Sequence, residues 1–148
     1  MSVKSELENA LKDAMRAGND LHKRTLRMAL SAIKQTEIDK GITLDDSGVM
    51  AILQKEVKTR REAIADAERA NRPDLAAASQ AEITFLESFL PKELTPEELE
   101  DLARQAIAEA SASSIREMGQ VMKVLMPRLQ GRATGDVASQ TVRRLLAG

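Results

Sequence analysis

Phe85 and Phe89 are the only phenylalanines of the chain, which contains no tyrosine and no tryptophan. Aromatic side chains are enriched in β-strands, whereas Ala, Leu, Met, Glu, Lys, Arg and Gln, which dominate here, favour helices. With 148 residues and 43% hydrophobic content, the chain is long enough to bury a core. The sequence therefore predicts an all-α, multihelical protein.

Apolar residues recur at helical spacing in four segments before Pro91, which cover residues 3–17, 20–40, 45–70 and 73–90. Gly18 and Gly41 follow the first two segments, where a glycine commonly ends a helix in the left-handed conformation. Pro73 stands at the first turn of the fourth segment, where a proline is tolerated. We expect these segments to form a four-helix N-terminal domain over residues 1–92.

The clearest helix start in the chain lies in the sequence LTPEEL, residues 94–99. Thr95 is a preferred N-cap residue, Pro96 is a preferred first helical residue, and Glu98 completes a capping box. Two further helices are expected, over residues 114–126 and 135–146. These elements predict a three-helix C-terminal bundle over residues 93–148.

The middle helix of that bundle has its own start and stop signals. Ser114 and Glu117 have the spacing of a capping box. Pro127 is expected to end the helix, which would place Arg128 in a glycine-bounded loop. Gly119 is expected to allow a neighbouring helix to approach closely.

The composition excludes several classes of site. There is no cysteine, which rules out disulfides, thiol catalysis and thiolate metal ligands, and His22 is the only histidine. We therefore expect no catalytic residues, no metal site and no cofactor. The formal net charge of −1 gives no overall attraction to nucleic acid or membrane, so any anion binding must come from a local patch.

The amino-terminal residues form an amphipathic pattern with mixed charges rather than an apolar signal segment. No apolar run approaches the roughly 20 residues that a membrane span needs. The sequence therefore predicts a cytoplasmic protein that does not bind membranes. Nothing in it indicates an oligomeric state.

A basic surplus develops near the carboxy terminus, where six basic side chains face only two acidic ones from residue 116 onward. The six candidates for phosphate contact are Arg116, Lys123, Arg128, Arg132, Arg143 and Arg144. Guanidinium groups bind phosphate through paired hydrogen bonds, so this set favours a sequence-independent grip on a nucleic-acid backbone. The alternative is an ordinary solvated helix surface, because such surfaces normally carry Arg and Lys.

Two further charge patterns have simpler interpretations. The acidic side chains of residues 97–109 are expected to place negative charge at the end of the C-terminal domain opposite its basic residues. In the N-terminal domain, the basic residues alternate with acidic ones, so pairing along one helix is sufficient to explain them. This second basic set comprises Arg24, Arg27, Lys34, Lys55, Lys58, Arg60 and Arg61.

Four segments of the chain match a known pattern: TLRMALSAIKQTEID, LQKEVKTRREAI, EITFLESFLPKELTPEELE and MGQVMKVLMPRLQGRATGD. They resemble the YqeY family, which is similar to the C-terminal tail of GatB, a subunit of the glutamyl/aspartyl-tRNA amidotransferase. The resemblance covers essentially the whole chain. It implies a larger N-terminal helical domain, a three-helix C-terminal domain and association with tRNA. By position in the shared segment, it makes Lys123, Arg128 and Arg132 the first candidates for RNA contact.

The resemblance implies no chemistry for this chain, because the amidase and kinase-like steps of that complex belong to segments that are absent here. We therefore expect a non-catalytic tRNA-binding or accessory protein, acting alone or docked to an aminoacyl-tRNA synthetase or amidotransferase. One alternative is a protein-interaction adaptor that uses the exposed N-terminal helices. Another is an accessory of a carbon–nitrogen ligase with glutamine as amido-N-donor.

Overall fold

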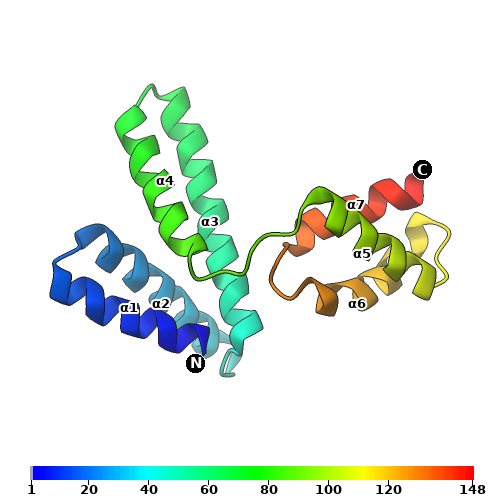
Figure 1. Cartoon of the computed structure of the whole chain (residues 1–148), viewed down its shortest axis with the longest axis horizontal. Helices are drawn as coiled ribbons and strands as arrows, with labels where there is room; N and C mark the ends of the chain where they lie inside the picture. The colour runs from blue at the N-terminus through cyan, green and yellow to red at the C-terminus, as the bar shows by residue number, and fades with distance from the viewer. Residues whose placement is uncertain (1) are drawn as a thin grey trace. The chain divides into compact units, whose positions relative to one another are not determined.

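The computed structural model describes residues 2–148 and confirms the predicted all-α class. Within these residues the chain forms seven α-helices and one short 3-10 helix, and no strand (Figure 1). None of the helices in this described range combines the length and apolar character needed to cross a membrane. The chain divides into two compact units, Met1–Pro91 and Lys92–Gly148.

The first unit contains the four long helices, and local capping sets their ends. They are α1 (Val3–Ala17), α2 (Asp20–Lys40), α3 (Asp46–Arg69) and α4 (Pro73–Glu87). The side chains of Asn19 and Asp45 accept hydrogen bonds from backbone N–H groups in the first turns of α2 and α3. Gly18 ends α1 with a φ of 67°, which confirms its predicted left-handed cap.

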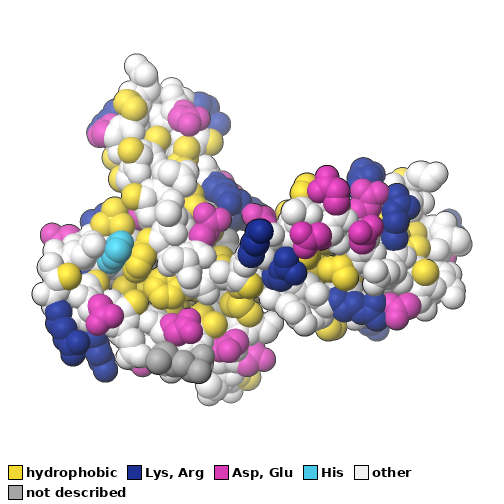
Figure 2. Space-filling view, viewed as in Figure 1, with side chains coloured by type: hydrophobic (Ala, Val, Ile, Leu, Met, Phe, Trp, Pro, Cys, Tyr) yellow, Lys and Arg dark blue, Asp and Glu magenta, His cyan; other side chains and the backbone are white. Residues whose placement is uncertain are grey.

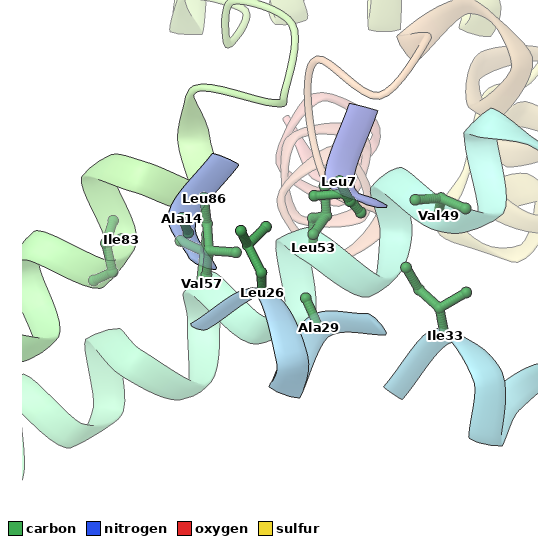
Figure 3. Packing of buried hydrophobic residues seen from close by; sticks show 10 residues of the cluster. All are labelled: Leu7, Ala14, Leu26, Ala29, Ile33, Val49, Leu53, Val57, Ile83 and Leu86. Carbon is green, nitrogen blue, oxygen red and sulfur yellow. The ribbon is translucent and has the colours of Figure 1, made fainter. Parts of the chain in front are cut away.

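The core of the first unit forms where these helices meet. Leu26 of α2, Leu53 of α3 and Leu86 of α4 are fully buried. They belong to one apolar cluster, which Leu7 of α1 joins from the amino-terminal helix. Figure 3 shows these side chains pointing toward one another between the helices. Burial of the aliphatic side chains supplies the main driving force for this packing.

The second unit contains α5 (Pro96–Glu109), a 3-10 turn η1 (Ile115–Glu117), α6 (Met118–Leu129) and α7 (Gly135–Ala147). The Thr95 side chain accepts from the Glu98 N–H at 3.1 Å, as the capping-box pattern predicts. A separate core lies between the three α-helices, with Ala103, Leu125 and Val142 fully buried. Small side chains such as Ala103 bring α5 close to its neighbours.

Two local predictions for the second unit are wrong. α6 continues through Pro127 to Leu129, so Arg128 lies on the helix and not in a loop. Pro127 falls in the last turn, where its missing N–H forfeits one hydrogen bond, while buried Leu125 and Leu129 hold that turn against the core. A Cβ at Gly119 would meet no atom within 4 Å, so this glycine does not serve close helix packing.

The predicted capping box at Ser114 forms only in part. The Ser114 side chain accepts no cap hydrogen bond, and the segment begins as the 3-10 turn η1. The Glu117 carboxylate instead accepts from the backbone N–H of Ser113 at 3.1 Å. That hydrogen bond holds the pKa of Glu117 below its ordinary value.

Candidate nucleic-acid interface

Arg128 does not project freely into solvent. It lies in the last turn of α6 and binds both carboxylate oxygens of Glu109, at the carboxyl end of α5, with a distance of 2.8 Å from Nη2 to Oε1. Glu109 remains half exposed, with 51% of its side chain accessible, against 38% for Arg128. The hydrogen bonds from Arg128 lower the pKa of Glu109.

Arg132 connects the start of the second unit to the segment between α6 and α7. Its Nε donates to the backbone carbonyl of Lys92 at 2.9 Å, and its Nη2 donates to the carboxylate of Glu98 at 3.1 Å. Its own carbonyl accepts from the N–H of Leu94 at 2.8 Å. The guanidinium is therefore held by one backbone carbonyl and one carboxylate, while the backbone of Arg132 is fixed by Leu94.

Arg144, on the outer side of α7, contacts α5 as well. Its Nη2 lies 3.3 Å from Oε2 of Glu100. The other oxygen of Glu100 accepts from Arg104, one turn further along α5, at 2.6 Å. Glu100 thus accepts hydrogen bonds from two guanidiniums. Both lower the pKa of Glu100, the one from Arg104 more than the one from Arg144.

The other three predicted contact residues are Arg116 on η1, Lys123 on α6 and Arg143 on α7. All three are exposed. Within residues 2–148, no carboxylate forms an ion pair with any of them. The structure therefore divides the six candidates into three paired with α5 and three open to solvent.

This division overturns the expectation that acidic and basic side chains occupy opposite ends of the second unit. Lys92–Gly148 carries eight basic and eight acidic residues, so the unit has no formal net charge. On the face shown in Figure 2, basic and acidic side chains of this unit lie next to each other. Any attraction for a polyanion must come from the unpaired cations or from exchange of the pairs.

Sequence reasoning missed the counter-ions because they lie far away along the chain. Glu109, Glu98 and Glu100 precede their partners by 19, 34 and 44 residues. Pairing at helical spacing is visible in a sequence, but these separations depend on how α5 packs against α6 and α7. The only local signal was the concentration of acids on α5.

The basic set of the first unit includes an ion pair that is more deeply buried than those of the second unit. Arg60 of α3 is buried, and its Nε donates to Glu82 of α4 at 2.8 Å. Arg24 of α2 contacts the other oxygen of Glu82 at 3.4 Å. Pairing along one helix accounts for only part of this set, since Arg60 lies 3.8 Å from Glu56 but closer to Glu82. These contacts join three helices.

The site offers no assembled metal-binding set. In the part of the chain that the structure describes, no group of three or more His, Cys, Asp or Glu side chains is arranged to hold a metal ion. The one histidine, His22, stacks on Phe85 with the ring centroids 3.7 Å apart. Its ring is thus engaged in packing between α2 and α4.

Several curated relatives from fungi carry the name altered inheritance of mitochondria protein 41, mitochondrial. One from Vanderwaltozyma polyspora is 38% identical over 85 residues, 57% of this chain and 46% of the relative. One from Pyrenophora tritici-repentis is 30% identical over 134 residues, 88% of this chain and 73% of the relative. The chain thus spans about half the length of the first of these two proteins.

These names correct the predicted cytoplasmic location, because the relatives are named as mitochondrial proteins. The sequence argument rested on the lack of an apolar signal segment. Mitochondrial transit peptides are amphipathic, so that argument does not distinguish between the two compartments.

The family comparison covers nearly the whole chain. The family described as Yqey-like protein matches residues 4–146, which include all seven α-helices except the first residue of α1 and the last of α7. The resemblance seen in the four sequence segments is therefore confirmed, and the chain belongs to the YqeY family.

Proposed function

We propose that this chain is a non-catalytic accessory protein that binds tRNA through the backbone phosphates. The first contacts come from Arg116, Lys123 and Arg143. The observation that carries the proposal is that these three cations are exposed and have no carboxylate partner within the described residues. Cations of this kind release counter-ions from a nucleic acid when they bind its phosphates.

The likeness to the tail of the amidotransferase subunit supports tRNA as the nucleic acid. The second unit has no formal net charge, which supports weak, sequence-independent binding to the phosphates over strong binding by this chain alone. A partner enzyme, an aminoacyl-tRNA synthetase or an amidotransferase, would then supply the specificity. In this arrangement the chain adds phosphate contacts to a complex whose chemistry lies in the partner.

A filter-binding titration of the full chain with unfractionated tRNA at several salt concentrations tests the proposal. Three phosphate contacts predict a slope of log K against log salt of about −2 to −3, at roughly −0.7 to −0.9 per contact. Replacing Arg116, Lys123 and Arg143 with Gln should remove most of the binding and of its salt dependence.

A matched control carries Gln in place of Lys12, Lys40 and Lys55, three exposed lysines of the first unit. It changes the net charge equally and should retain the wild-type slope. Salt-independent retention of tRNA, or equal losses in both triple variants, would overturn the proposal and leave the protein-interaction adaptor as the better candidate.

A further inference from the structure

We infer that Glu98, Glu100 and Glu109 of α5 are built-in counter-ions that compete with a polyanion for Arg132, Arg144 and Arg128. In this view α5 masks half of a phosphate-binding surface, and a nucleic-acid backbone unmasks it by replacing the carboxylates. The inference rests on the proposed function. It adds the residues that set the strength of the contact.

The pairing is specific to position along α5. Each of the three arginines has a different carboxylate partner, in the pairs Arg128–Glu109, Arg132–Glu98 and Arg144–Glu100, and Glu100 also binds Arg104. Glu97 and Asp101 belong to the same helix and are exposed, but within residues 2–148 neither forms an ion pair. A general excess of acid on α5 does not explain this selection.

The exposure of these pairs makes them exchangeable. In the pair Arg128–Glu109, 38% and 51% of the two side chains are accessible, whereas the values for Arg60–Glu82 in the first unit are 7% and 16%. Water and salt screen exposed pairs, which therefore contribute little to stability. A phosphate offers the same two acceptor oxygens as a carboxylate, so it can replace Glu109 without a change in the geometry of the guanidinium.

Arg132 would stay in place after such an exchange. The hydrogen bond from its Nε to the Lys92 carbonyl does not involve Glu98. Loss of the Glu98 contact would free Nη2 while the guanidinium kept its orientation. A donor that is already ordered loses less conformational entropy when it binds a ligand.

The experiment compares two triple variants of the full chain in the same tRNA titration. The first replaces Glu98, Glu100 and Glu109 with Gln, which removes the counter-ions and keeps the size of each side chain. The second replaces Glu93 and Glu97 with Gln and Asp101 with Asn, which changes the net charge equally but removes no ion pair. Gln at residue 98 can still complete the capping box with Thr95.

The Gln variant unmasks four arginines, because Glu100 also binds Arg104. In the wild type, each carboxylate that a phosphate displaces takes up a cation from solution, which cancels the counter-ion released at the new contact. Removing the carboxylates removes this cancellation and should make the salt slope steeper by about 3 to 4, at roughly 0.7 to 0.9 for each phosphate contact. The control variant should bind somewhat more tightly through its added charge but keep a slope close to that of the wild type. Circular dichroism of both variants verifies that helicity is retained. The single change Glu109→Gln provides a second test, because a carboxylate at the carboxyl end of a helix does not stabilise it. It should steepen the slope by about 0.7 to 0.9.

The outcomes separate the two proposals. The masking inference alone would be overturned if the wild-type slope is about −2 to −3 and neither the Glu98/Glu100/Glu109 variant nor Glu109→Gln changes it. It would also be overturned if the variant without the three counter-ions and its charge-matched control have equal slopes. If neither the wild type nor the unmasked variants show salt-sensitive binding, the proposed function fails and the inference with it.

Discussion

Arg60 and Arg61 are neighbours in α3, but they have different environments. The side chain of Arg60 is enclosed between helices and bonded to Glu82, whereas Arg61 lies at the surface, 3.5 Å from Glu87. A buried charge that loses its partner must bear the cost of desolvation, while an exposed charge is solvated by water. The same type of ion pair should therefore have very different effects on stability at these two positions.

The change Glu82→Ala removes the 2.8 Å partner of buried Arg60, leaves it only the longer 3.8 Å contact to Glu56, and also removes the contact to Arg24. It should lower the free energy of unfolding of the first unit by about 3 kcal/mol. The matched change Glu87→Ala removes an exposed partner on the same helix and should cost less than about 1 kcal/mol. Urea unfolding followed by circular dichroism measures both. Equal losses in the two variants would contradict the burial argument.

Among the helices, the sequence predicted best the ends that depend on local capping. α1 ends at Ala17, as Gly18 predicts, and α5 begins at Pro96, as the N-cap Thr95 predicts. α6 was predicted less well, because Pro127 signals a stop that packing of Leu129 overrides. Local rules predict an end well when no buried side chain lies beyond it.

Two glycines test the distinction between backbone conformation and packing. A Cβ would meet no atom within 4 Å at either Gly18 or Gly119, so no neighbouring residue crowds either position. Gly18 has a positive φ of 67°, whereas Gly119 lies within α6. Gly18→Ala should therefore lower the free energy of unfolding by about 1 kcal/mol. Gly119→Ala should raise it by about 0.5 kcal/mol. Chemical unfolding of the two variants should show shifts of opposite sign, and destabilisation by both would contradict this explanation.

At the scale of the whole molecule, the helical class was predictable because it follows from composition and periodicity. The candidate site was predictable only by residue type. The sequence predicted Arg128, Arg132 and Arg144 as phosphate ligands, but it did not predict their carboxylate partners on α5. Such pairs form when helices that are distant in sequence pack together, so no spacing along the chain predicts them. Lys123 and Arg143 were predicted from the same basic surplus, but within residues 2–148 they have no carboxylate partner.

The predicted division between residues 1–92 and 93–148 can be tested through the two cores. Leu26 and Leu125 are fully buried, and they belong to different apolar clusters with no member in common. Replacing either leucine with Ala leaves a cavity and should cost about 2 to 5 kcal/mol. If each core stabilises its own unit, the loss should remain local to the helices around it.

Amide hydrogen exchange measured along the whole chain shows directly whether a substitution destabilises only its own unit. Leu26→Ala should speed exchange of protected amides in α1–α4 and leave those of α5–α7 at wild-type rates, while Leu125→Ala should do the reverse. Each variant serves as the control for the other. Faster exchange throughout the chain in both variants would mean that the two clusters unfold as one cooperative block. In that case the binding tests above could not treat the second unit as separable from the first.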